Sequence, residues 1–167
     1  MTRSLVIGIG NPLRGDDGLG QAVVEKLSAS GLDADALAVH QLTPELAEPI
    51  SSAGTVVFVD AAHDEPPGKV NCSRIAPALG DDDPALSHHL GPATVLSLAE
   101  KLYGHCPAAY IVTTGGDQFE LGASLSPPVR LAVPEVLRVV QHLLQNGTEN
   151  RTNGTPSANF SETPILD

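Results

Sequence analysis

Residues 4–30 read SLVIGIGNPLRGDDGLGQAVVEKLSAS, a continuous apolar run joined to a periodic one by a glycine-rich turn. In the first seven residues, the apolar side chains Leu5, Val6, Ile7 and Ile9 are too continuous to alternate between faces, which is typical of a strand buried on both faces. Within residues 18–30, Leu19, Val23 and Leu27 form one apolar stripe, so a helix is predicted there. A buried strand, a tight turn and a helix begin a βαβ unit, and they predict an α/β fold.

The rest of the chain continues this alternation of strands and helices. Further strands are predicted at residues 36–42, 55–61, 68–75 and 108–115. Further helices are predicted at residues 43–50, at residues 92–102, and at the C-terminal face formed by Val133, Leu137, Val140 and Leu144. This order indicates a mostly parallel sheet of about five strands with helices on both faces. In such sheets, ligands bind beyond the carboxyl ends of the strands.

Length and charge limit the organisation and the partners of the chain. Its 167 residues predict one domain over residues 1–146, and the polar Asn-, Thr- and Ser-rich stretch 147–167 is expected to be a disordered tail. Nine basic residues against twenty acidic ones give a net charge of −11, which argues against a nucleic-acid partner. No apolar stretch approaches the ~20 residues of a membrane span, and no signal peptide is visible, so a cytoplasmic protein is expected.

The glycine-rich turn differs from a dinucleotide-binding fingerprint. Gly8 and Gly10 have the right spacing, but Leu13 stands where the third glycine belongs. Asp16 and Asp17 follow at the mouth of the turn, where two carboxylates would repel a pyrophosphate. The turn is therefore expected to hold a cation instead.

Other polar residues at strand ends support a cation site. Asp60 ends an apolar strand, and His88 and His89 lie in the loop after the predicted edge strand. Together with Asp16 or Asp17, these side chains suit a divalent transition metal with open coordination positions. The residues alone leave a structural alternative open. In that alternative Asp17 favours a helix N-terminus, Asp60 caps a turn and the histidines are solvated.

Other catalytic patterns are weaker. The chain has no HExxH motif, and Ser124 lacks the GxSxG context of a hydrolase nucleophile. Cys106 follows His105, but sequence neighbours rarely face each other productively, and Cys72 and Cys106 are expected to be free thiols.

Three segments carry a resemblance to a known family: GIGNPLRGDDGLG at 8–20, VVFVDAA at 56–62 and SHHLGPATVLSLA at 87–99. Over about residues 4–145 the chain resembles the nickel–iron hydrogenase maturation endopeptidases, and QLTPEL at 41–46 resembles their bidirectional-hydrogenase branch. The resemblance implies a three-layer α/β/α sandwich with a twisted sheet. It also implies an enzyme that removes the C-terminal extension of the hydrogenase large-subunit precursor after nickel insertion.

The resemblance also implies roles for individual residues. The metal ligands would be Asp17, Asp60 and His88, while His89 falls where family members vary. Nickel would arrive with the precursor and be held weakly by the enzyme alone. Asp17 and Asp60 would also act in catalysis, and Asp16 or Asp17 would be the general base. The protein itself is expected to be a monomer.

One feature departs from the family, and two other functions remain open. Some relatives carry a catalytic Asp after the second strand; here Glu45 is the nearest acid. The same ligands would also serve a non-catalytic nickel-binding chaperone. The start of the turn is also similar to peptidyl-tRNA hydrolases, but it continues as LRGDDGLG without their Thr-Arg-His-Asn continuation.

Overall fold

The computed structural model describes residues 3–78 and 90–149 as one sheet covered by helices. The strands are β1 (Ser4–Ile9), β2 (Ala34–Val39), β3 (Thr55–Pro67), β4 (Val70–Ile75) and β5 (Ala108–Gly115). The helices are α1 (Leu19–Ala29), α2 (Ala47–Ser52), α3 (Pro92–Tyr103) and α4 (Pro127–Glu149). Two 3₁₀ turns, η1 (Gly15–Gly18) and η2 (Pro44–Leu46), precede α1 and α2.

The five strands form a sheet in the order β2-β1-β3-β5-β4. The pairs β1–β2, β1–β3 and β3–β5 are parallel, and β4 is an antiparallel edge strand beside β5. The predicted mostly parallel sheet of five strands, with an edge strand at residues 68–75, is therefore confirmed.

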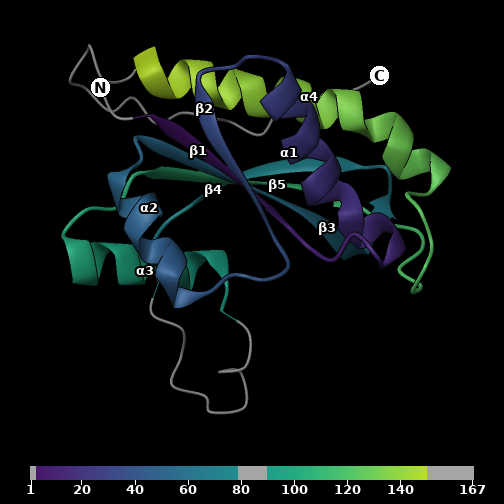
Figure 1. The fold of residues 1–167 in the computed structure, drawn as a ribbon, viewed down its shortest axis with the longest axis horizontal. Helices are drawn as coiled ribbons and strands as arrows, with labels where there is room; N and C mark the ends of the chain where they lie inside the picture. Colours follow the sequence, from purple (N-terminus) through teal and green to yellow (C-terminus); the bar gives the residue numbers. More distant parts are fainter. Residues whose placement is uncertain (1–2, 79–89, 150–167) are drawn as a thin grey trace.

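Helices cover both faces of the sheet, as Figure 1 shows, with α2 and α3 on one face and α1 and α4 on the other. Successive side chains of β3 point to opposite faces of the sheet, so the strand contributes to both hydrophobic cores. Val56 and Phe58 belong to the core that contains Ala47, Ile50 and residues of α3. Val57 and Val59 belong to the core that contains residues of α1 and α4. This is the predicted three-layer α/β/α sandwich.

Two strands differ from the predicted bounds. β2 covers residues 34–39 rather than 36–42, and its residues are half-buried or exposed because it is an edge strand. β3 continues six residues past the predicted end at residue 61, because Pro67 still pairs with Gly115 after an irregularity in the register. An apolar pattern in the sequence predicts which residues are buried. It therefore does not identify strand residues that are exposed but still hydrogen-bonded to a neighbouring strand.

The last helix is longer than its apolar periodicity predicts. α4 begins at Pro127 and runs through Pro134 to Glu149. Pro127 and Pro128 fit there because the first helical turn has no internal partner for its N–H groups. The helix also passes the predicted domain end at residue 146, since Gly147 packs against Thr55. The remainder of the predicted tail, residues 150–167, lies outside the described residues.

The order of the strands changes direction at β1. The chain leaves β1 through α1 to reach β2 on one side, and returns through α2 to reach β3 on the other. Because α1 and α2 cover opposite faces, a topological switch point lies between β1 and β3. Such a switch point is where open α/β sheets bind their ligands.

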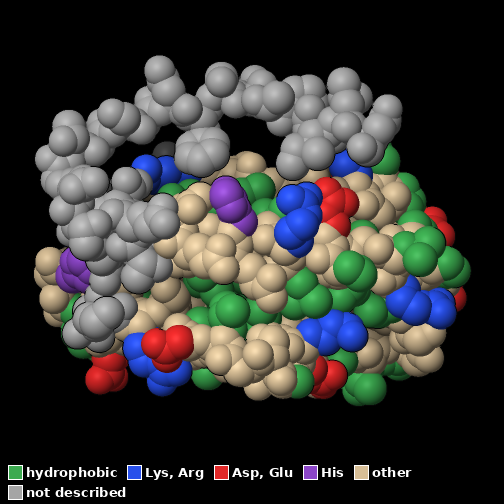
Figure 2. Space-filling model, turned by 90° about the horizontal axis from the view of Figure 1, so that it is seen from above, with side chains coloured by type: hydrophobic (Ala, Val, Ile, Leu, Met, Phe, Trp, Pro, Cys, Tyr) green, Lys and Arg blue, Asp and Glu red, His purple; other side chains and the backbone are tan. Residues whose placement is uncertain are grey.

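The surface carries a mixture of side chains. On the face that Figure 2 shows, Lys and Arg side chains lie scattered among acidic and hydrophobic ones rather than in one stripe. Among the described residues, none of the helices combines the length and apolarity that crossing a membrane requires.

Candidate functional site

The glycine-rich turn is shaped around Asp17. The backbone N–H of Asn11 donates to Oδ2 of Asp17 at 2.7 Å, and the side-chain Oδ1 of Asn11 accepts from Leu13 N–H at 2.9 Å. Gly10 has a φ of 135°, and a Cβ at this position would collide with the backbone and side chain of Asp17. Only glycine lets the chain pass so close to this carboxylate.

A second pair of glycines allows α1 to approach β1. A Cβ on Gly8 would meet the backbone of Gly20, and a Cβ on Gly20 would meet the backbone of Gly8 and Ile9. Because the helix packs directly on the strand, the turn between them is held at the carboxyl end of β1. The glycines in residues 8–20 therefore set the position of Asp17.

Asp16 is buried and fully engaged. Its Oδ2 accepts hydrogen bonds from the backbone N–H groups of Asp117 at 2.7 Å and Gln118 at 2.9 Å, and from the Ser126 hydroxyl at 2.8 Å. Its Oδ1 accepts from the backbone N–H of Ser126 at 2.7 Å. Burial raises the pKa of Asp16, but the hydrogen bonds from Gln118, Asp117 and Ser126 outweigh it, so the pKa lies below its usual value.

This geometry corrects the proposed role of Asp16 as a general base. A base needs an accessible oxygen and a pKa near the working pH, whereas Asp16 has no exposed surface and a lowered pKa. Its carboxylate instead joins the η1 turn to the loop before α4. Sequence reasoning missed this because the partners lie 101 to 110 residues away.

Asp60 lies where β3 leaves β1. The pairing of β1 with β3 ends at Gly8 and Val59, while Asp60 still pairs with Thr113 of β5. Asp60 therefore lies at the switch point. Burial and, to a smaller extent, the negative charge of Asp17 together raise the pKa of Asp60 to about 7, against the lowering effect of the hydrogen bond that the Ala61 N–H donates to Oδ1 at 2.8 Å.

The structure thus brings Asp17 and Asp60 together from two elements. Two partly buried carboxylates that repel each other are suited to a divalent cation. The described residues contain no cluster of three His, Cys, Asp or Glu side chains that would complete a metal site by themselves. The other predicted ligand, His88, and its neighbour His89 lie outside the described residues.

Solved structures with the same fold have a known role. The chain is 25% identical to the hydrogenase maturating endopeptidase HybD from E. coli, with a TM-score of 0.68, over 86% of this chain and 93% of that one. It is 26% identical to the [NiFe] hydrogenase maturation protease HycI from Thermococcus kodakarensis, with a TM-score of 0.65, over 87% and 94% of the two chains. A hydrogenase 2 maturation peptidase from a Thaumarchaeota archaeon gives 26% identity and a TM-score of 0.62, over 85% and 97%.

The chain resembles the hydrogenase maturation endopeptidases. It is an enzyme of their kind, a peptidase. Neither a protein-family model nor a curated protein sequence matches it. The narrower resemblance to the bidirectional-hydrogenase branch stays a prediction.

For such a peptidase, Glu45 is not placed as a catalytic acid. It lies exposed in η2, where hydrogen bonds from its own backbone N–H and from the side chain of Thr43 lower the pKa of its carboxyl. Thr43 and Glu45 thus stabilise the start of the segment that leads into α2, and Pro44 occupies its first position as predicted.

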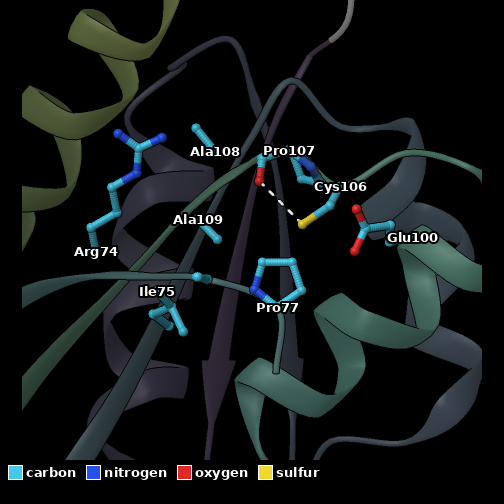
Figure 3. Close-up of a pocket in the computed structure, with 9 residues that line it drawn as sticks. Arg74, Ile75, Pro77, Glu100, Cys106, Pro107, Ala108 and Ala109 are labelled. Carbon is cyan, nitrogen blue, oxygen red and sulfur yellow. Dashed lines mark hydrogen bonds between the residues drawn. The ribbon is translucent and has the colours of Figure 1, made fainter. Parts of the chain in front are cut away.

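The cysteine considered as a nucleophile lies at the wrong end of this peptidase. Cys106 precedes β5 and lines a cavity of about 300 Å³ that also contains Arg74 and Glu100, as Figure 3 shows. Asp60 pairs near the opposite end of β5. Burial and the charge of Glu100 raise the pKa of the Cys106 thiol, which keeps it in the less reactive protonated form.

Proposed function

We propose that the chain removes the C-terminal extension of a nickel–iron hydrogenase large-subunit precursor after nickel insertion, and that it recognises the precursor through the bound nickel. The observation that carries this proposal is the pair of carboxylates, Asp17 and Asp60, at the switch point of a maturation-peptidase fold. Within the described residues, neither carboxylate forms a salt bridge. A cation carried by the substrate would relieve their repulsion, and we expect the reaction in the cytoplasm.

The proposed ligand set is Asp17, Asp60 and His88, with the precursor's thiolates completing the coordination. When bound, nickel would supply Lewis-acid chemistry, polarising the scissile carbonyl or lowering the pKa of an attacking water. Carboxylate and imidazole donors leave open positions for the substrate. Recognition by the metal would make an empty precursor a poor substrate.

The chain's own residues supply position and proton transfer. Asp16 holds the η1 turn to the loop before α4, and this fixes the position of Asp17 at the switch point. Since Asp16 is bound to that loop, the carboxylate that accepts a proton from the attacking water is Asp17 or Asp60. Without a cation, burial raises the pKa of Asp60 to about 7, and a bound cation would lower it and favour the carboxylate form that accepts a proton.

The test is incubation of the purified chain with nickel-loaded and nickel-free large-subunit precursor, followed by mass spectrometry of the precursor's C-terminus. Cleavage of the nickel-loaded form alone supports the proposal. Equal cleavage of both forms would remove the role of nickel in recognition. Binding of nickel-loaded precursor without cleavage would instead indicate a nickel-dependent chaperone.

A further inference from the structure

A row of polar side chains leads away from Asp60 across the sheet. Asp60 of β3 pairs with Thr113 of β5, and Thr113 pairs with Asn71 of β4. Residues that pair directly across neighbouring strands project from the same face of a sheet. Asp60, Thr113 and Asn71 therefore share one face and form a row, which we call the polar row, running from the switch point to the edge strand.

The far end of the polar row holds a donor without a partner. The side-chain Nδ2 of Asn71 is buried and has no hydrogen-bond partner within the described part of the chain. Buried donors are nearly always satisfied, because leaving one unpaired loses the free energy of its hydration. Asn71 as a residue is only half-buried on the edge strand, so a turn of its side chain would present this donor to a ligand that brings an acceptor.

The other unpaired polar atom does not compete for this role. Thr114 Oγ1 is also buried without a partner among the described residues, but Thr114 follows Thr113 directly in β5. Successive strand residues point to opposite faces, so Thr114 faces the α1 and α4 side. Of the two, only Asn71 belongs to the face of Asp60.

The spacing of the polar row fits an extended peptide. Neighbouring strands lie ~4.8 Å apart, so Asn71, two strands away, is about 10 Å from Asp60. An extended chain advances ~3.3 Å per residue, so about three residues span this distance. A peptide with its scissile bond at Asp60 therefore reaches Asn71 about three residues further along.

We propose that Asn71 forms a substrate subsite, in which Nδ2 donates a hydrogen bond to a backbone carbonyl of the precursor about three residues from the cleaved bond. Thr113 lies between this contact and Asp60 and lines the path of the peptide. This inference rests on the proposed function, because it takes the peptide bound at Asp60 to be the peptidase substrate. Because this hydrogen bond is made to the backbone of the peptide, the subsite accepts different side chains at that position.

The test compares Asn71→Leu with Ser73→Ala. Leucine has nearly the same shape as asparagine but no donor, and Ser73 is an exposed residue two positions along the same strand and on the same face. Kinetics with nickel-loaded precursor and thermal unfolding of the free enzyme are measured for both. We expect Asn71→Leu to raise KM about five- to tenfold with little change in kcat, and to raise the Tm, because it removes an unpaired buried donor. Ser73→Ala is expected to change neither.

The outcomes separate the subsite from the proposed function. A fall in Tm together with equal losses in kcat and kcat/KM for Asn71→Leu would show that Asn71 only supports the fold, and would overturn the subsite. Asn71→Val, which suits a strand, repeats the comparison with a different shape. If the wild type cleaves precursor and KM is unchanged in both variants, the subsite alone is wrong. If the wild type fails to cleave, the proposed function is wrong and the subsite falls with it.

Discussion

At the scale of single residues, three aspartates in two segments have three different environments. Asp16 is buried among four donors, Asp17 accepts one backbone N–H at the switch point, and Asp60 is partly buried with a raised pKa. Asp16 and Asp17 are neighbours in sequence, but they differ in role because η1 turns their side chains toward different partners. The chemical role of each aspartate therefore depends on its burial and its hydrogen bonds, and not on residue type alone.

The proposed ligands predict a specific pattern of loss. Asp17→Ala, Asp60→Ala and His88→Ala should each reduce cleavage of nickel-loaded precursor by about a hundredfold or more, whereas His89→Ala should be milder. Asp60→Ala should not lower the Tm at pH 8, since it removes a charge that burial disfavours. Cleavage assays and thermal unfolding check both effects. If His89→Ala abolishes cleavage while His88→Ala remains active, the assignment of the imidazole is wrong.

For Asp16, we expect substitution to lower the stability of the fold. In Asp16→Asn, an amide NH₂ replaces one acceptor oxygen and faces the donors of Asp117, Gln118 and Ser126. We expect a loss of about 3 kcal/mol in the free energy of unfolding, because buried donors lose their acceptor. Ser126→Ala removes only the hydroxyl contact and should cost about 1 kcal/mol. Urea unfolding measures both; equal stability of Asp16→Asn and wild type would contradict the role assigned to Asp16.

Part of the candidate site was predictable from residue patterns. Asp60 ends a fully apolar run, and Asp17 follows a strand at a turn, so both were expected at the carboxyl edge of the sheet. The function of Asp16 was not predictable, since its partners are backbone groups of a loop more than 100 residues away. Backbone donors leave no signal in the sequence, because every residue type except proline carries one.

At the scale of elements, the positions of strands were easier to predict than their lengths. β1 and β5 follow apolar runs, so their predicted and observed bounds nearly coincide. β2 and the last part of β3 pair at exposed positions, where the apolar pattern fades although the hydrogen bonds continue. The contact between β1 and α1 depends on glycines, whose role appears only when the two backbones are seen together.

This contact predicts that Gly20→Ala is destabilising. A Cβ at residue 20 would lie 2.5 Å from the backbone nitrogen of Ile9, so α1 must move away from β1. We expect a loss of about 1–3 kcal/mol in the free energy of unfolding, and a loss of cleavage because Asp17 moves with the helix. Gly91→Ala is the control, since a Cβ there meets nothing within 4 Å. A Gly20→Ala enzyme as stable as Gly91→Ala would contradict this account of the packing.

At the scale of the whole molecule, the C-terminal helix closes one core. Val136, Val140 and Leu144 of α4 are buried with residues of β3 and α1. A chain cut after residue 149 keeps these contacts and should match the full chain in Tm and cleavage, because the polar composition of residues 150–167 offers little apolar surface to bury. A chain cut after residue 143 loses Leu144 and should melt several degrees lower. If the chain cut after residue 149 also melts below the full chain, residues 150–167 stabilise the domain.

The number of ligands that the whole molecule brings together also predicts how tightly the enzyme holds metal. The described residues place two carboxylates together but no complete cluster, so the purified enzyme should retain nickel only substoichiometrically after desalting. Thiolates of the precursor would add ligands at high local concentration, so affinity should rise strongly in the complex. Metal analysis of the free enzyme, with cleavage of both precursor forms after chelation and desalting, tests this. A conventional metalloprotease would behave differently: it would retain stoichiometric zinc, lose activity when stripped and cleave nickel-free precursor at the normal rate. That result would overturn recognition through substrate-borne nickel, because the enzyme would then carry its own catalytic metal.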